Sequence, residues 1–148
     1  MDTKTLPKTG KIICLIIFII YIAVVLKLTI FRVGVYYNEP QLNLSLFTDL
    51  IKTYKNAGLW QFSRLFLGNI GWFVPFGFLL PILLKKMNLL KVAVLGFLFS
   101  FGIETMQYIF RKGVAELDDL ILNTLGAVIG YLLYKFLTEK ILQKQEIN

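Results

Sequence analysis

The side chains in this sequence that could perform chemistry are mainly carboxyl groups. Histidine is absent and cysteine occurs once, which excludes histidine-dependent triads, Cys/His zinc sites and a disulfide framework. The candidate catalytic residues are Glu104, Asp118 and Asp119, whose carboxyl groups could act as general acid and base or bind a hard cation such as Mg²⁺. One function that these residues allow is therefore a carboxylate-based enzyme.

The carboxyl groups belong to a wider set of polar residues with helical spacing. Glu104, Gln107 and Arg111 lie at positions i, i+3 and i+7, which places them on one face of a helix. Asn123 follows Asp119 by four residues and shares its face. We predict a ligand-binding site made of Asn69, Glu104, Gln107, Arg111, Glu116, Asp118, Asp119 and Asn123. We expect neither a resident metal ion nor a cofactor.

The composition indicates that these polar residues lie in a membrane protein. Of the 148 residues, 57% are hydrophobic and 17% are charged, and the mean hydropathy is +0.69. Soluble proteins average about 45–50% apolar and about 25% charged residues, so a soluble domain of this kind could not cover itself with polar surface. Four segments are long and apolar enough to cross a bilayer: Ile12–Phe31, Leu65–Leu84, Leu89–Phe110 and Leu120–Phe136. We therefore predict an all-α polytopic membrane protein, a bundle of four transmembrane helices.

The basic residues indicate how this bundle is oriented. More of them fall on the side that holds both termini, and the loops on that side are shorter. We expect both termini in the cytoplasm, as tails at 1–11 and 138–148 on either side of a single transmembrane domain at 12–137. This distribution also accounts for most of the formal net charge of +7 without a nucleic-acid partner.

The first outer loop contains a further amphipathic segment. Leu46, Phe47, Leu50, Ile51 and Tyr54 recur at helical spacing, with charged residues on the opposite face. This pattern predicts a short amphipathic helix that lies in the outer membrane interface or re-enters between the spans.

In this topology the polar residues of the spans converge on the outer half of the bundle. Asn69 lies near the outer start of the second span, and Glu104 lies near the outer end of the third. The acidic residues before Asn123 lie at the outer start of the fourth. A carboxylate inside the bilayer costs several kcal/mol unless it is protonated, paired or hydrated. We therefore expect a polar cavity that opens to the outer leaflet.

Structural roles could also explain these residues. Glu104 could be a buried hydrogen-bond clamp, with Arg111 or amides across the bundle as its partners. Acidic residues at the start of a helix are commonly caps. Gly126 and Gly130 form a GxxxG pair, which favours close helix packing and could also join two copies as a homodimer.

Five short motifs, in this order along the chain, resemble those of the VanZ-like family. They are Leu42-Asn43-Leu44-Ser45-Leu46-Phe47, Gly68-Asn69, Phe73-Val74-Pro75-Phe76-Gly77, Glu104 with Gln107, and the E-x-D-D-x-x-x-N-x-x-G-x-x-x-G pattern from Glu116 to Gly130. The sequence departs from the family pattern at Leu46, where proline is usual, and at Glu116, where aspartate is usual. The family's arginine before the acidic cluster would fall near Gly113, whereas this chain has Arg111 and Lys112.

The resemblance implies a protein of the Gram-positive bacterial cell membrane that is associated with lowered susceptibility to teicoplanin-like lipoglycopeptides. The leading hypothesis is a non-enzymatic factor that binds a lipoglycopeptide or a lipid-linked cell-wall precursor in the polar cavity, with membrane lipids as further partners. The alternative is a carboxylate-based enzyme, with or without a requirement for Mg²⁺, that acts on a lipid-linked cell-wall precursor. A third hypothesis is a small transporter or accessory subunit with Glu104 as a proton relay.

Overall fold

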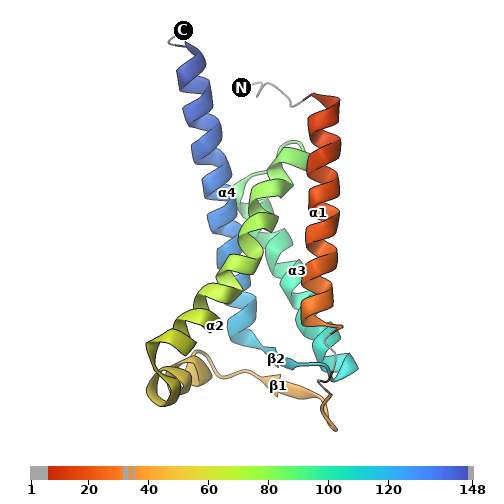
Figure 1. The fold of residues 1–148 in the computed structure, drawn as a ribbon, viewed down its shortest axis with the longest axis vertical. Coiled ribbons are helices and arrows are strands. Elements are labelled where there is room, and N and C mark those ends of the chain that lie inside the picture. Colours follow the sequence, from red (N-terminus) through yellow and green to blue (C-terminus); the bar gives the residue numbers. More distant parts are fainter. Residues whose placement is uncertain (1–6, 32–33, 35, 147–148) are drawn as a thin grey trace.

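The computed structural model describes residues 7–31, 34 and 36–146, most of which form four long helices (Figure 1). The elements in chain order are α1 Lys8–Thr29, β1 Gln41–Asn43, α2 Thr48–Leu83, α3 Leu89–Phe110, β2 Val114–Glu116 and α4 Leu117–Glu146. Within the described residues, four helices are long and apolar enough to cross a membrane: Lys8–Thr29, Thr48–Leu83, Leu89–Phe110 and Leu117–Lys140. The predicted all-α fold with four membrane-spanning helices is thus confirmed.

The two ends of the bundle differ in structure. α1 begins, and α4 ends, at the same end of the molecule, while β1, β2 and the start of α2 lie at the opposite end (Figure 1). The expected tails are partly helical, because α1 already begins at Lys8 and α4 continues to Glu146. Residues 1–6 and 147–148 lie outside the described residues.

Glycines bring α2 and α4 into close contact. A Cβ atom added at Gly126 would lie 2.1 Å from the carbonyl oxygen of Ile70, and one at Gly130 would lie 2.1 Å from that of Val74. Both glycines are buried. Gly126 and Gly130 thus pack against α2 of the same chain, in line with the close helix packing that a GxxxG pair favours. The homodimer that this pair could also form stays a prediction.

The core lies where α2, α3 and α4 meet. Phe73 and Phe76 of α2, Val92 of α3 and Ala127 of α4 belong to one buried apolar cluster. In α1, by contrast, Val25 is the one described residue of the helix that is buried. α1 therefore packs on the outside of the other three helices and leaves most of its apolar surface for contact with lipid.

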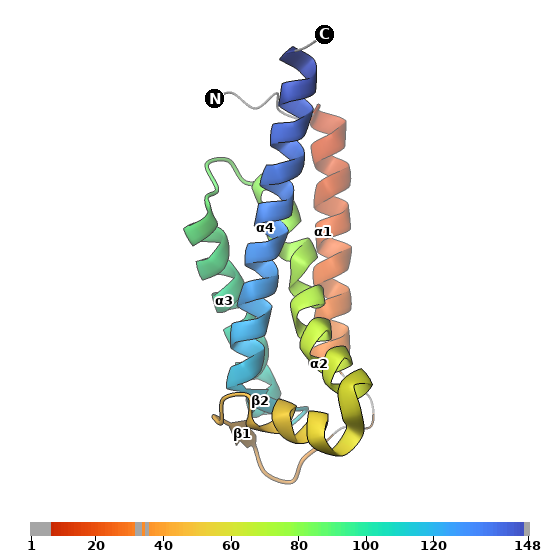
Figure 2. The same cartoon turned by 90° about the vertical axis from the view of Figure 1, so that its left-hand side faces the viewer.

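α2 changes direction at Gly58. This residue has φ 78° and ψ 179°, a backbone conformation that is outside the helical region and that glycine adopts at little cost. The part of α2 before Gly58 runs across the end of the bundle, and the part after it runs along the bundle (Figure 2). A helix is thus present where we predicted a short amphipathic one, from Thr48 onwards. Its position in a membrane interface stays a prediction.

Two short strands, which the sequence analysis did not predict, close this end of the bundle. β1 and β2 pair in parallel, and the paired residues are Gln41 with Val114, Leu42 with Ala115, and Asn43 with Glu116. This pairing joins the segment after α1 to the start of α4. We name residues 36–57 together with β2 the cap.

Candidate functional site

Two buried carboxyl groups hold the cap on the bundle. Glu104 of α3 accepts a hydrogen bond from the backbone N–H of Glu116, with 2.9 Å between Oε2 and N. Asp118, in the first turn of α4, accepts one from the backbone N–H of Phe47, with 2.8 Å between Oδ1 and N. The exposed fractions of Glu104 and Asp118 are 5% and 2%. These carboxyl groups therefore fix β2 and the start of α2 in place.

Two side-chain amides connect α4 with its neighbours. Asn69 of α2 donates a hydrogen bond through Nδ2 to Oδ1 of Asp119. Deeper in the bundle, Asn123 donates through Nδ2 to Oγ of Ser100 on α3, at 2.9 Å. The structure thus brings together polar residues from α2, α3 and α4. These are the helices from which we expected the site residues to come.

Arg111 does not pair with Glu104. We considered either Arg111 or an amide across the bundle as the partner of Glu104, and the structure shows an amide, the backbone N–H of Glu116. Arg111 ends α3 in a left-handed conformation, with φ 55°. Its Nη1 donates to the carbonyl oxygen of Asn38 at 2.6 Å, and its own carbonyl oxygen accepts from the N–H of Tyr37 at 3.0 Å. Arg111 therefore holds the first residues of the cap.

Gln107 connects α3 with the end of α1. Its Nε2 donates to the carbonyl oxygen of Thr29 at 3.3 Å. Its Oε1 is buried and has no hydrogen-bond partner in the described part of the chain. A Cβ atom at Gly113 would lie 3.0 Å from Cδ of Gln107, so the turn into β2 packs directly on this amide. Gln107 is thus placed for packing between helices and lies outside the groove described below.

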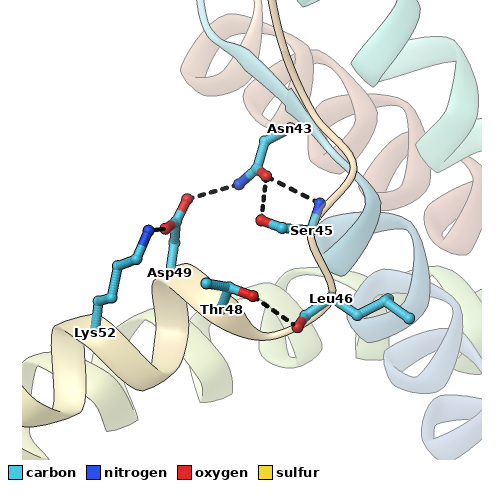
Figure 3. A network of polar contacts seen from close by, with 6 residues as sticks. All are labelled: Asn43, Ser45, Leu46, Thr48, Asp49 and Lys52. Carbon is cyan, nitrogen blue, oxygen red and sulfur yellow. Dashed lines mark hydrogen bonds and ion pairs between the residues drawn. The ribbon is translucent and has the colours of Figure 1, made fainter.

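Sequence analysis missed a polar network within the cap itself (Figure 3). Asn43 donates through Nδ2 to Oδ2 of Asp49 at 2.7 Å, and its Oδ1 accepts from the backbone N–H of Ser45 at 3.1 Å. Asp49 also pairs with Lys52 at 2.8 Å. The signal that could have revealed this network is the family motif at 42–47, which contains both Asn43 and Ser45.

A groove of about 240 Å³ lies between the cap and the adjoining ends of α3 and α4. Its lining residues are Leu42, Leu44, Phe101, Glu104, Thr105, Tyr108, Ala115, Glu116, Leu117 and Leu120. This groove is not the polar cavity that we expected, because most of its lining is apolar. The physical reason is that Glu104 and Asp118 turn oxygen atoms towards backbone amides, while leucine and aromatic side chains form the wall.

Glu116 differs from Glu104, Asp118 and Asp119, whose carboxyl groups each accept a hydrogen bond. Glu116 is among the residues around the groove, whose exposed surface is almost wholly apolar, and its side chain forms no hydrogen bond or ion pair among the described residues. Burial and the nearby carboxylates of Asp118 and Asp49 raise the pKa of Glu116 above its ordinary value. Ionisation of Glu116 is therefore less favourable than that of an exposed glutamate.

This pKa shift predicts that Glu116→Gln stabilises the protein at neutral pH. A carboxyl group whose pKa is raised by folding binds its proton more tightly in the folded than in the unfolded state. The protein is therefore most stable below the unfolded pKa of this group, and its free energy of unfolding falls as the pH rises through the folded pKa. We expect a gain below about 1 kcal/mol, because solvent screens a half-buried charge. Thermal unfolding in detergent should show a higher midpoint for Glu116→Gln at pH 7.

The same comparison at low pH provides the control. Below about pH 4 the wild-type carboxyl group is protonated in both states, so the two midpoints should converge. A Glu116→Gln midpoint that lies below the wild-type value at pH 7 would contradict the repulsion that we describe.

The buried polar residues occupy one half of the bundle. Ser100 lies seven residues before Gln107, or about 10 Å further from the cap. One turn beyond Ser100 the helices pack tightly, since a Cβ atom at Gly96 would lie 2.7 Å from Cβ of Ala127. Val92, one turn further, is completely buried. The polar residues of the site thus lead from the cap to mid-depth and are followed by apolar packing.

The fold and the site together define a class of membrane protein with four candidate spans. At one end of the bundle, buried carboxyl groups anchor a cap, and an apolar groove lies beside it. A sequence-family model described as VanZ/LLP1 matches residues 18–138, and the chain belongs to this family. Protein VanZ of Enterococcus faecium is 28% identical to it over 142 residues, which cover 92% of this chain and 82% of that protein. No solved structure matches the chain. The resemblance seen in the five motifs is thereby confirmed.

Proposed function

We propose that this multi-pass membrane protein lowers the susceptibility of Gram-positive cells to teicoplanin-like lipoglycopeptides by binding a lipidated or lipid-linked molecule at its capped end. The VanZ family is linked to teicoplanin resistance, and the similarity to Protein VanZ extends over 92% of the chain. Candidate ligands are a lipoglycopeptide itself and a lipid-linked cell-wall precursor.

The observation that carries this proposal is the apolar groove beside the cap. Its volume of about 240 Å³ is below the roughly 300–1,000 Å³ of pockets that enclose a whole drug-sized ligand. The groove therefore suits one part of a larger molecule, and its leucine and aromatic lining suits a hydrocarbon chain. A lipid chain is the part that lipoglycopeptides and lipid-linked precursors have in common.

We place the cap at the outer leaflet and both termini in the cytoplasm. Basic residues gather at the opposite end of the bundle, where α1 begins, α2 is joined to α3, and α4 ends (Figure 1). They are Lys8, Lys11, Lys85, Lys86, Lys91, Lys135 and Lys140. An excess of lysine is typical of the cytoplasmic side of a membrane protein.

Binding accounts for the site better than catalysis or transport. The candidate catalytic groups Glu104, Asp118 and Asp119 each accept a hydrogen bond from an amide of the chain itself. These bonds support a structural role for the carboxyl groups. The change from polar to apolar packing at mid-depth favours a site that is accessible from one side of the membrane.

Saturable binding to the purified protein tests this proposal. We expect the protein in nanodiscs to bind a lipoglycopeptide at least about tenfold more tightly than the same glycopeptide without its acyl chain. The acyl chain also partitions into the bilayer, so the expected difference must come from packing of the chain against the groove wall rather than from its transfer out of water. Empty nanodiscs correct for partitioning into lipid. Equal binding of the two glycopeptides, or no saturable binding above that of empty nanodiscs, would refute the proposal.

A further inference from the structure

Part of the cap buries little apolar surface against the bundle. We name residues 39–57, all of which the structure describes, the lid. Leu50 is the one buried residue of the lid, at 7% exposed, and every other large apolar side chain of the lid is at least 36% exposed. A segment with few buried apolar contacts can open locally without unfolding of the whole protein. The lid is therefore held on the bundle mainly by hydrogen bonds.

Two sets of hydrogen bonds join the lid to the bundle. β1 pairs with β2 over three residues, and the backbone N–H of Phe47 donates to the carboxylate of Asp118 at 2.8 Å. β2 itself is held on α3 by Glu104, which accepts from the N–H of Glu116. Of the two buried carboxyl groups that anchor the cap, Asp118 thus binds the lid, while Glu104 binds a strand that would stay with the bundle if the lid moved.

The lid has a hinge at one end and an internal network that joins its parts. Gly58, directly after the lid, has φ 78° and ψ 179°, and it separates the lid from the part of α2 that runs along the bundle (Figure 2). A Cβ atom at Gly58 would meet nothing within 4 Å, so no neighbour obstructs the backbone there. Asn43, Asp49 and Lys52 link β1 to the start of α2 (Figure 3). The two parts of the lid can therefore move together about Gly58.

We propose that the lid opens about Gly58 and that the hydrogen bond between Asp118 and Phe47 is its latch. In the closed position Leu42 and Leu44 of the lid form one wall of the groove. Opening removes this wall, so that a molecule too large for the closed groove of about 240 Å³ can enter. It also frees the carboxylate of Asp118 to accept a hydrogen bond from that molecule in place of the one from Phe47. The inference concerns access to the site and goes beyond the proposed function, because it holds for whichever ligand the groove takes.

Thiol labelling of the full-length protein in nanodiscs tests this inference. Cys14, the one cysteine of the chain, is replaced by serine. A single reporter cysteine is then introduced in the lid by Leu50→Cys, or in the bundle by Ile103→Cys, at a position that is 3% exposed on α3. Lys55→Cys, at an exposed position of the lid, gives the labelling rate of an open site. We expect a maleimide to label the Leu50→Cys protein more slowly than the Lys55→Cys protein and faster than the Ile103→Cys protein.

Two further variants separate opening of the lid from loosening of the bundle. Asp118→Asn keeps the shape of the latch but removes its charge, and Gly58→Ala disfavours the backbone conformation of the closed lid. Each should raise the labelling rate at Leu50→Cys at least about fivefold and leave the rate at Ile103→Cys unchanged. Gly71→Ala is the control, because a Cβ atom there also meets nothing within 4 Å, and it should change neither rate. An unchanged rate at Leu50→Cys in either variant, or an equal rise at Ile103→Cys, would overturn the inference.

Discussion

Replacing Gly77 by alanine is expected to prevent the bundle from folding. A Cβ atom at this position would lie 1.8 Å from the backbone carbonyl oxygen of Ala127. The backbone of α4 cannot turn aside as a flexible side chain could, so α2 and α4 would have to separate. Overpacking that side chains can absorb costs about 1–3 kcal/mol, and we expect a larger loss here because a backbone must shift.

Gly71→Ala is the matched control for this prediction. Gly71 lies on the same helix, and a Cβ atom there would meet nothing within 4 Å. Alanine is the better helix former by about 1 kcal/mol in water, so this variant should fold at least as well as the wild type. Yield and monodispersity in detergent size-exclusion chromatography compare the two variants. A monodisperse Gly77→Ala protein at wild-type yield would contradict the contact between α2 and α4.

The expected failure of Gly77→Ala concerns the site as well as the fold. The α2–α4 contact positions Asn69 against Asp119. It also positions the start of α4, where Asp118 accepts a hydrogen bond from the backbone N–H of Phe47. Small residues in the helices thus determine where the carboxyl groups of Asp118 and Asp119 can lie. This dependence gives a packing reason for Gly77, Gly126 and Gly130, which belong to the five motifs.

The membrane spans and the convergence of polar residues could be predicted from the sequence. Span prediction needs only apolar segments of sufficient length, and α3 was predicted with the observed bounds, Leu89–Phe110. The helical spacing predicted Glu104, Gln107 and Arg111 on one face of a helix; Glu104 and Gln107 are both buried on α3, whereas Arg111 ends the helix in a left-handed conformation. These inferences depend on neighbours within one helix, which the sequence records directly.

The cap could not be predicted, because its contacts join distant segments. β1 and β2 have three residues each, too few for an alternating pattern to be recognised. Asp118 accepts its hydrogen bond from Phe47, which precedes it by 71 residues. Nothing in the local sequence shows that this acid binds an amide of the cap rather than one of its own helix.

The character of the groove was also beyond the sequence. We expected that costly carboxyl groups would line a polar cavity, but Glu104 and Asp118 are satisfied by backbone amides instead. The apolar lining then comes from three separate segments, with Leu44 near β1, Phe101 on α3 and Leu120 on α4. Only the folded structure shows that these residues share one wall.

Replacing Thr105 by phenylalanine is expected to abolish protection against a lipoglycopeptide while the protein still folds. Thr105 lines the groove and is partly exposed, so a phenyl ring can occupy the groove without entering the core. If the groove holds the lipid chain, a phenyl ring in its place removes the packing contacts that distinguish the groove from the surrounding lipid, so specific binding is lost. Met106→Phe is the matched control, because Met106 is the next residue of α3, is 45% exposed and lies outside the groove lining.

The most direct test is the lipoglycopeptide susceptibility of Gram-positive cells that express the wild type, Thr105→Phe or Met106→Phe at matched levels in the membrane. We predict that the wild type and Met106→Phe raise the minimal inhibitory concentration several-fold over cells without the protein. Thr105→Phe should give the same value as cells without the protein. Equal protection by Thr105→Phe and the wild type would contradict the claim that the groove binds the lipid chain.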